Sequence, residues 1–317
     1  MEVGLAKEQC VNLIEEAVVR TVVYADVFNF PMTSREIAHF LIADSPYSLS
    51  QIESTLHNSD ALRFFIESAE GYWFCRGRGE IVEIRRAHEH ASAQLWSQAM
   101  RCGGWLSYLP FVRMVALTGA LAMRNAAHAS DDIDYLLITA SGRVWTARLF
   151  AVILVRLAKL RGITICPNYV LSEQALVQSR QTLYIAHEVA QMIPLHGRAL
   201  YEKMRDANKW VCQQMPNSAQ PFYDLPEIGQ NRFIAWFKRA AERLLSGKLG
   251  DSLDAWEHRR KMYRFAPELE KPHAAARLDR DHVKGHFEDH GHFIMSAYDE
   301  RLRHYDIAET PLPLAGD

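Results

Sequence analysis

Two aspartates at the start of an apolar run are the residues of this chain that most readily suggest chemistry. Asp132 and Asp134 are two positions apart, beside and within the strand-like run from Ile133 to Thr139. Because side chains alternate between the two faces of a strand, both carboxylates point the same way. Neighbouring carboxylates raise each other's pKa unless a cation lies between them. Mg²⁺, or Mn²⁺ in its place, is such a cation, since proteins hold it with carboxylates, substrate phosphates and water.

A glycine turn precedes this pair. Gly119 follows the strand-like run from Val112 to Thr118 and precedes a short helical piece from Leu121 to Asn125. The backbone amides at the start of a helix can hold phosphate, and glycine lets the backbone approach a ligand closely. Metal-binding carboxylates that face a phosphate-binding turn suggest phosphoryl or nucleotidyl transfer. Alone, either feature is commonplace, since an acidic strand entrance is often a solvated turn.

The combination resembles the signature of the DNA polymerase beta-like nucleotidyltransferase superfamily, over about residues 111–215. That signature is an apolar residue, Gly, then Gly or Ser, followed after roughly ten residues by Asp-x-Asp or Asp-x-Glu. Here eleven residues separate Ala120 from Asp132. The resemblance implies a mixed sheet, divalent metal on Asp132 and Asp134, and contacts from Gly119 and Ala120 to the triphosphate of a nucleotide.

The implied reaction moves a nucleoside monophosphate from a nucleoside triphosphate to a hydroxyl acceptor, with pyrophosphate as the leaving group. The sequence identifies neither the acceptor nor the preferred base. The candidate catalytic and metal-binding residues are Asp132 and Asp134, and the candidate nucleotide-binding or phosphate-binding residues are Thr118, Gly119, Ala120, Arg124, Ser130 and Asn168. Arg143 and Arg148 are further cations near the motif, for which a solvated surface position is favoured.

Two departures from the superfamily pattern favour an alternative. Ala120 replaces the second Gly or Ser, and Asn168 occupies the place of a third carboxylate on a later strand. An amide oxygen carries no charge and cannot act as a general base. Glu173 and Glu188 are the possible substitutes. The alternative is a catalytically degenerate nucleotide-binding or regulatory protein, which acts through its N-terminal domain or its basic C-terminal stretch.

The elements around the motif predict an α/β core between two helical regions. Helices over 11–28 and 33–41, a third from a Ser50/Glu53 capping box to His57, and a hairpin over 62–75 predict a winged helix in residues 1–78. A connecting helix over 79–104 ends at Gly103 and Gly104. Residues 105–215 form the nucleotidyltransferase-like domain, with strands near 112–118, 133–139 and 163–171 and helices near 145–160 and 182–192. In the order of these elements the chain resembles a family of uncharacterised bacterial and archaeal proteins, in which a winged helix precedes a nucleotidyltransferase domain.

Charge gives little support to nucleic-acid binding by the winged helix. The candidate recognition segment Ser50 to Asp60 lacks Lys and Arg. DNA-binding proteins use such residues to contact the groove and the phosphate backbone of the DNA. A role in protein or domain docking is favoured. On the helix near 182–192, His187, Glu188 and Gln191 share one side, either as part of a pocket or as a surface network.

The C-terminal region, residues 216–317, is predicted to be helical, with a proline-rich linker near its start and a loose tail over 306–317. From Gln230 to Arg264 it holds nine Lys or Arg against four acids. Its first helix carries an apolar stripe formed by Phe233, Trp236, Phe237, Ala240 and Leu244. We expect the stripe to pack on the core, and contact with a membrane is the alternative. His282, His286 and His290 recur every four residues and are expected to be solvated.

Composition bounds the remaining possibilities. The 317 residues are 49% hydrophobic and 23% charged, with a net charge of −2, which is typical of globular proteins and excludes collagen-like, disordered and disulfide-scaffold classes. The longest apolar stretch is interrupted by Arg156 and Lys159, so no transmembrane segment is expected. Five scattered cysteines without metal spacing and an N-terminus without a secretion pattern predict a cytoplasmic protein with reduced thiols.

Overall fold

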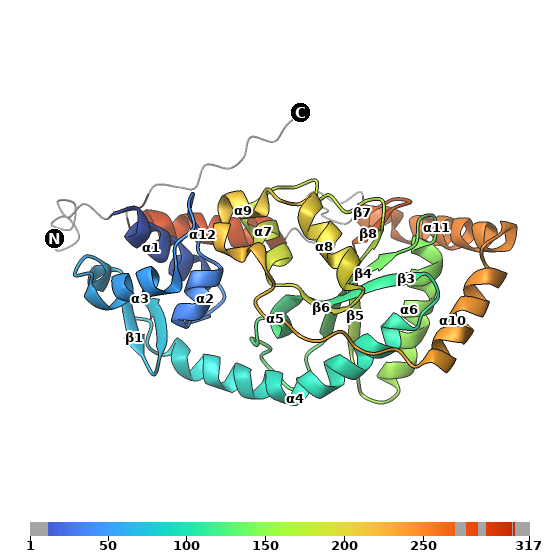
Figure 1. Ribbon diagram of the computed structural model, residues 1–317, viewed down its shortest axis with the longest axis horizontal. Helices are drawn as coiled ribbons and strands as arrows, with labels where there is room; N and C mark the ends of the chain where they lie inside the picture. The colour runs from blue at the N-terminus through green and yellow to red at the C-terminus, as the bar shows by residue number, and fades with distance from the viewer. Residues whose placement is uncertain (1–11, 270–276, 285–289, 306, 308–317) are drawn as a thin grey trace.

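The chain folds around one mixed β-sheet that lies between helices (Figure 1). The computed structural model describes residues 12–269, 277–284, 290–305 and 307. Within these residues it has twelve α-helices, a six-stranded sheet and a separate two-stranded hairpin. The chain is therefore a mixed α/β protein, as the sequence predicts at this level.

The N-terminal unit consists of three helices followed by the hairpin. These are α1 (Leu13–Asp26), α2 (Ser34–His39), α3 (Leu49–Asn58), β1 (Ile66–Ala69) and β2 (Tyr72–Cys75), with a short 3-10 turn at Leu62–Phe64. The capping box of Thr33 and Glu36 is present as predicted. The predicted box of Ser50 and Glu53 is wrong: Ser48 caps α3, and Gln51 bonds back to its amide, so the helix begins earlier than expected.

Helix α4 (Ile81–Ser107) connects this unit to the sheet and runs along one side of the whole molecule. It continues through Gly103 and Gly104, so the prediction that these glycines end the helix is wrong. A Cβ atom on Gly103 would lie 2.5 Å from Leu195 Cδ1. The glycine therefore serves close packing of the helix on a strand instead of serving as a hinge.

The strand order of the sheet is β6-β3-β4-β5-β8-β7. Strands β3 (Val112–Leu117), β4 (Ile133–Thr139) and β5 (Ile165–Ser172) match the predicted strands to within a few residues. Only the β4–β5 pair is parallel. Strands β7 (Arg277–Leu278) and β8 (His282–Lys284) lie in the C-terminal region that the sequence predicts to be helical, and the structure corrects this. Strand β6 (Ile193–His196) directly follows the predicted 182–192 helix, in a stretch for which no strand is predicted. Pro194 is tolerated in β6 because that strand is at the edge of the sheet.

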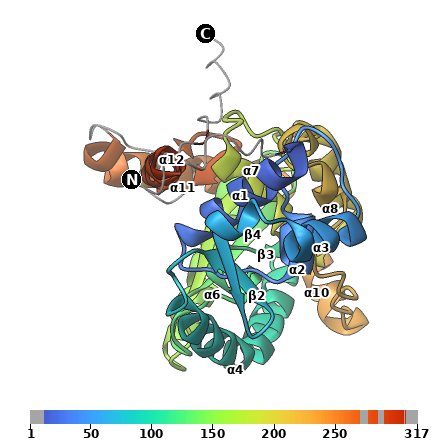
Figure 2. The ribbon, with the colours of Figure 1, turned by 90° about the vertical axis from the view of Figure 1, so that its left-hand side faces the viewer.

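Different helices pack on the two faces of the sheet (Figure 2). On one face, Tyr135 and Leu137 pack with α4 and with α6 (Val144–Lys159). On the other face, Leu136 and Ile138 pack in a core that also contains α1, α2 and the helices α7 (Leu183–Ala190), α8 (Arg198–Ala207), α9 (Val211–Gln214) and α12 (His290–His304). Asp134 shares the face of Leu136, because side chains alternate along β4. The N-terminal unit and the sheet therefore bury one common core above Asp134.

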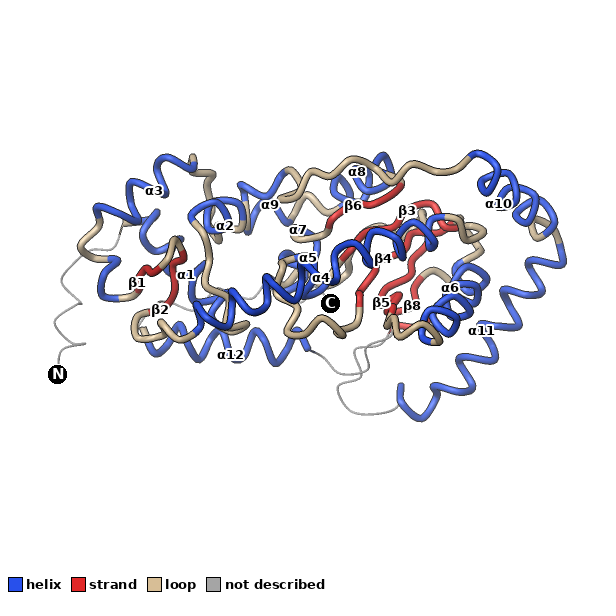
Figure 3. The backbone as a smooth tube through the Cα atoms, turned by 90° about the horizontal axis from the view of Figure 1, so that it is seen from below, coloured by secondary structure: helices blue, strands red, loops and turns tan. Residues whose placement is uncertain are grey.

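The C-terminal region first extends away from the sheet and then packs against it again. After a 3-10 turn at Pro216–Ala219, helix α10 (Arg232–Leu244) lies at the opposite end of the molecule from the N-terminal unit, and α11 (Lys248–Leu269) packs on α6 (Figure 3). His282 is buried in β8, which corrects the expectation of a solvated side chain. His286 and nearly all of the predicted tail lie outside the described residues. Within the described part, no helix has the length and apolar composition needed to cross a membrane.

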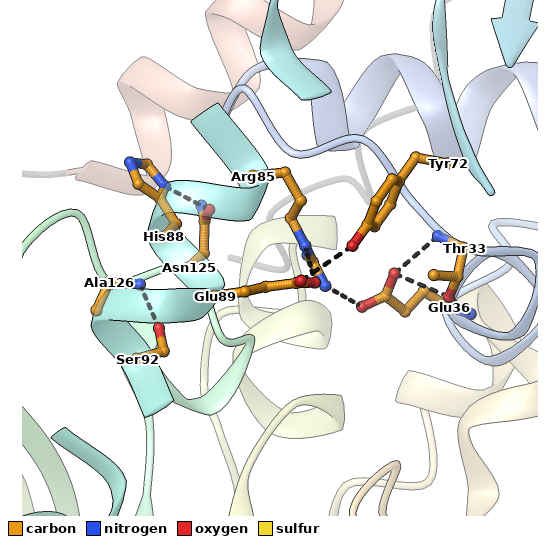
Figure 4. Close-up of polar contacts among 9 residues, drawn as sticks. All are labelled: Thr33, Glu36, Tyr72, Arg85, His88, Glu89, Ser92, Asn125 and Ala126. Atoms are coloured by element: carbon orange, nitrogen blue, oxygen red, sulfur yellow. Dashed lines mark hydrogen bonds and ion pairs between the residues drawn. The ribbon is translucent and has the colours of Figure 1, made fainter. Parts of the chain in front are cut away.

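A buried ionic cluster fixes the N-terminal unit to α4 (Figure 4). Arg85 of α4 is 2% exposed; it donates to Glu36 of α2 at 2.8 Å and to Glu89 at 2.7 Å. Its guanidinium also lies 3.8 Å from the centre of the Phe30 ring. Tyr72 of β2 donates to Glu89. Glu36 also accepts from the Thr33 amide and so caps α2. Through Glu36, Arg85 and Tyr72 the cluster joins α2, α4 and β2.

Replacing Arg85 with alanine should destabilise the protein by about 3–5 kcal/mol, because Glu36 would remain buried without its cation. The free energy of unfolding measured in urea tests this. Arg86→Ala is the matched control: Arg86 is the next residue of the same helix, and its pair with Glu70 is exposed, so its loss should cost about 0–1 kcal/mol. Equal losses for the two variants would show that the cluster contributes no more than a surface pair.

Candidate functional site

The two predicted aspartates lie together at the N-terminal end of β4. Asp134 is within the strand and half-buried, and Asp132 precedes it and is exposed. Asp134 pairs in register with Cys166 of the parallel strand β5. The ligand atoms of Asp132, Asp134 and Cys166 lie within 4.8 Å of one another. The structure therefore brings the carboxylate pair together and adds a thiol to it.

The glycine turn packs directly on the Asp134 carboxyl group. The amide of Thr118 donates to the Asp134 carbonyl at 3.0 Å, which holds the end of β3 against β4. Gly119 begins the short helix α5 (Gly119–Ala122) with a φ of +66°. A Cβ atom there would lie 2.4 Å from Asp134 Oδ2. The left-handed backbone favours glycine at this position, and the close approach of Asp134 leaves no room for a Cβ atom.

Burial and charge leave Asp134 poorly stabilised as an anion. Burial first, and then the negative charge of Asp132, raise the pKa of Asp134 from 3.8 to about 7, while a hydrogen bond from the Cys166 thiol acts in the opposite direction. Asp134 Oδ1 is buried and has no hydrogen-bond partner among the described residues. Burial and the charge of Asp134 raise the pKa of Cys166 to about 12, so its thiol stays protonated. A cation at this place would relieve both carboxylates.

Asp134 faces a cavity of about 360 Å³ between the sheet and α7. Thr118, Gly119 and Asn168 line it with Asp134. Two cations, Arg180 and Lys284, also line this cavity, so it combines carboxylates with positive side chains. Asn168 Oδ1 is buried without a hydrogen-bond partner among the described residues. The cavity therefore offers oxygen ligands on one side and cations for an anionic ligand as well.

Glu188 of α7 also lines this cavity. Burial raises the pKa of Glu188, and the positive charge of Lys284 and the hydrogen bond from Gln191 Nε2 oppose the rise. The distance from Gln191 Nε2 to Glu188 Oε1 is 2.7 Å. Of the two possible substitutes for a third carboxylate, Glu188 is the one that reaches the cavity. Glu173 instead accepts from the amide of Ser141 and lies outside it.

A second cavity of about 250 Å³ adjoins the first and is largely apolar. Gly119, Tyr184 and Glu188 line both cavities. The N-terminal unit supplies much of its wall, through Thr21, Tyr24, Ala25, Phe28, Phe30, Met32 and Phe40. His187 completes the wall: its ring stacks on Tyr24 with centroids 3.9 Å apart, and burial lowers its pKa to about 4, so the ring is neutral.

The structure separates the remaining candidates from the site. Ala120 lines only the second cavity. The Arg124 guanidinium lies 3.4 Å from the centre of the Trp96 ring, and burial lowers its pKa. Ser130 is exposed in the turn before β4. Neither Arg124 nor Ser130 lines either cavity.

The other charged residues near the motif have structural partners. Arg143 pairs with Asp251 at 2.6 Å. The Arg148 guanidinium lies 6.0 Å from the centre of the Trp145 ring, and its Nη1 is buried without a hydrogen-bond partner among the described residues. The expectation of a solvated surface position is therefore wrong for both arginines. Asp131 accepts from the amide of His128 and so belongs to the turn.

Sequence reasoning missed three residues of the site. Cys166 lies two positions before Asn168 in the same predicted strand, so the alternation of side chains was a usable signal for it. Lys284 belongs to β8, and Arg180 to the segment before α7. Both reach the cavity only through long-range packing, for which the local sequence carries no signal.

Comparisons with protein-family models, with curated proteins and with solved structures find no match.

Two glycines with nearly the same positive φ separate the cost of the left-handed backbone from the cost of contact with Asp134. Gly142 has a φ of +67°, close to that of Gly119, but open space where a Cβ would lie. Gly142→Ala should cost about 1–2 kcal/mol for the left-handed backbone alone. Gly119→Ala should cost a further 1–3 kcal/mol, roughly the cost of overpacking. Urea unfolding of both variants measures the difference, and equal losses would rule out the contact.

The raised pKa of Asp134 predicts a pH dependence of stability. Between about pH 4 and pH 7 the carboxyl ionises in the unfolded chain but stays protonated in the folded one, so stability falls as pH rises through this window. A rise from 3.8 to about 7 corresponds to a loss on the order of 4 kcal/mol. Asp134→Asn has no carboxyl to ionise and so does not lose this stability. In the presence of a chelator, its free energy of unfolding should exceed that of wild type towards pH 8. The Gly142→Ala curve should run parallel to wild type. A parallel Asp134→Asn curve would contradict the raised pKa.

Proposed function

We propose that the protein is a metal-dependent nucleotidyltransferase, which moves a nucleoside monophosphate from a nucleoside triphosphate to a hydroxyl group. One observation carries the proposal most directly: the Gly119 turn lies against the Asp134 carboxyl group, at a cavity that also holds Arg180 and Lys284. Asp134, a close backbone turn and two cations line one cavity, with Asp132 next to Asp134 outside its wall, and this combination suits a metal-bound polyphosphate ligand.

The residues present fit a divalent cation. Asp134 Oδ1 and Asn168 Oδ1 are both buried oxygens without hydrogen-bond partners among the described residues, and Asp132 supplies a second carboxylate. Oxygen ligands favour Mg²⁺ or Mn²⁺, and the protonated Cys166 thiol donates to Asp134 instead of competing as a ligand. When bound, the cation would lower the pKa of an attacking hydroxyl and neutralise phosphate charge.

The chain's own groups position the nucleotide. Gly119 lines the cavity of Asp134 and begins α5, and the first amides of a helix have no acceptor within it. Its amide can therefore donate to a phosphate oxygen. Arg180 and Lys284 supply positive charge at the cavity wall. The triphosphate then lies between the turn and these cations, with its α-phosphate beside Asp132 and Asp134.

Glu188 is placed to receive the proton of the acceptor hydroxyl. It faces both cavities, so a hydroxyl at their junction would lie between Glu188 and the Asp134 side of the site. In the reaction the hydroxyl oxygen forms a bond to the α-phosphorus, the bond to the β-phosphate oxygen breaks, and pyrophosphate leaves with the electron pair. The raised pKa of Glu188 suits a carboxylate that accepts a proton.

The aromatic wall of the second cavity suits the body of the acceptor or another apolar group that carries the hydroxyl. The N-terminal unit, whose helix order resembles a winged helix, would then act by forming this wall. Its α3 has no Lys or Arg, and Glu53 is exposed on it, which disfavours a role in binding nucleic acid.

A catalytically degenerate, nucleotide-binding protein remains the second candidate. The observation that favours it is the uncharged Asn168 on β5, where the superfamily places a carboxylate. Binding in this case would still need Asp132, Asp134 and the turn, but no product would form. Magnesium-dependent nucleotide binding is thus common to both candidates, and turnover separates them.

Thermal unfolding with each nucleoside triphosphate and Mg²⁺ tests the shared claim. A ligand at about 100 times its dissociation constant stabilises by roughly 2.7 kcal/mol, which should raise the midpoint by a few degrees. The rise should require Mg²⁺ and should be lost in Asp134→Asn. Arg143→Gln is a control, because Arg143 lies away from the cavity. A rise that persists in Asp134→Asn, or none with any nucleotide up to millimolar concentration, would contradict the proposal.

A further inference from the structure

Helix α10 is attached to the protein by one side only. Lys238 Nζ donates to the carbonyls of Ser107 at 2.8 Å and Val112 at 2.6 Å. Glu242, one turn later, accepts from the amide of Phe111 and from Arg113, both at 2.7 Å. Because residues four apart share a face, Lys238 and Glu242 define the side of α10 that faces the body.

The opposite side of α10 carries the apolar stripe of the sequence. At about 100° per residue, Phe233, Trp236, Ala240 and Leu244 lie across the helix from Lys238 and Glu242, with Phe237 at the edge. Phe233, Trp236, Phe237 and Leu244 are 69%, 57%, 52% and 71% exposed. No residue of α10, all of which is described, is buried. The expectation that the stripe packs on the core is therefore wrong.

Positive charge accompanies this exposed stripe. Arg232, Arg239 and Arg243 are exposed and lie along one flank of it, on the helix positions between the stripe and the body. Glu242 is the one acid of α10, all of which is described, and it faces the body and binds Arg113. The other three acids of residues 230–264 lie on α11: Asp254 accepts from the Thr146 amide, Glu257 binds Arg260, and Asp251, which is exposed, pairs with Arg143. The outward surface of α10 thus combines aromatic side chains with a cationic ridge.

We propose that α10 lies on the surface of an anionic lipid bilayer, with the stripe in the interfacial region and the three arginines at the headgroups. A helix with Phe, Trp and Leu on one face and basic residues beside them is suited to this position. Anionic headgroups complement the arginine ridge, and the acyl boundary covers the stripe.

A second copy of the chain complements this surface less well. Its α10 would cover the stripe, but it offers another arginine ridge where acids are needed, because Glu242 is bound to the body. The helix also lies at the far end of the molecule from the N-terminal unit (Figures 1 and 3), which supplies much of the wall of the second cavity. Membrane contact would therefore leave that cavity wall uncovered. The inference does not rest on the nucleotidyltransferase proposal.

Flotation of the full chain with vesicles tests the proposal. We expect binding to phosphatidylcholine vesicles that contain phosphatidylserine, little binding to phosphatidylcholine alone, and weaker binding as salt rises. Phe233→Ser/Trp236→Ser should abolish binding. Arg239→Gln/Arg243→Gln should weaken it by about thirtyfold, since two headgroup interactions are lost.

Matched controls come from another exposed helix surface. Leu160, just after α6, is 84% exposed, and Arg156 lies one turn before it. Leu160→Ser/Arg156→Gln should bind vesicles like wild type. All variants change exposed side chains, and an unchanged thermal midpoint checks their folding.

Three results would overturn the proposal. They are no binding of wild type to the anionic vesicles, equal binding by the stripe variant, or a dimer in sedimentation analysis that Phe233→Ser/Trp236→Ser dissociates. The last would assign the stripe to a second copy of the chain.

Discussion

The contact between Gly119 and the Asp134 carboxyl group is the constraint on which the candidate site depends. It brings a backbone turn against a half-buried carboxylate, and it can exist only because the turn has no Cβ at that point. The β4–β5 register adds Cys166, whose thiol supports Asp134 without adding charge. The result is a carboxylate pair with a buried oxygen left without a partner. Such an arrangement is costly without a cation and well suited to one.

The rest of the fold gives this carboxylate its surroundings. Alternation along β4 turns Asp134 to the sheet face that α7 and the N-terminal unit cover, and the stack of Tyr24 on His187 joins these two. The buried Arg85 cluster holds the N-terminal unit in the same place from the side of α4. The N-terminal unit, for which the sequence favours a docking role over DNA binding, therefore forms a wall beside the site. Its aromatic residues face a cavity instead of solvent.

The sequence predicts what is local and misses what depends on packing. Strand β4 and the glycine turn could be read directly, because apolar runs and a glycine between strand and helix leave a clear pattern. Strand β8 could not, since it is short and is stabilised by pairing with β5 from far along the chain. Gly103 and Gly104 are typical of a helix end, but α4 continues through both, and the small size of Gly103 allows the close contact with Leu195. Arg124 was a reasonable phosphate ligand by position, and the ring of Trp96 holds it elsewhere.

Binding of Mn²⁺, followed by electron paramagnetic resonance in the presence of a nucleoside triphosphate, tests the central claim most directly. We expect a bound-ion signal that requires the nucleotide for full strength, is lost in Asp134→Asn and survives in Asp131→Asn, whose carboxyl belongs to the neighbouring turn. An undiminished signal in Asp134→Asn would contradict it, because the ion would then lie somewhere other than between Asp132 and Asp134.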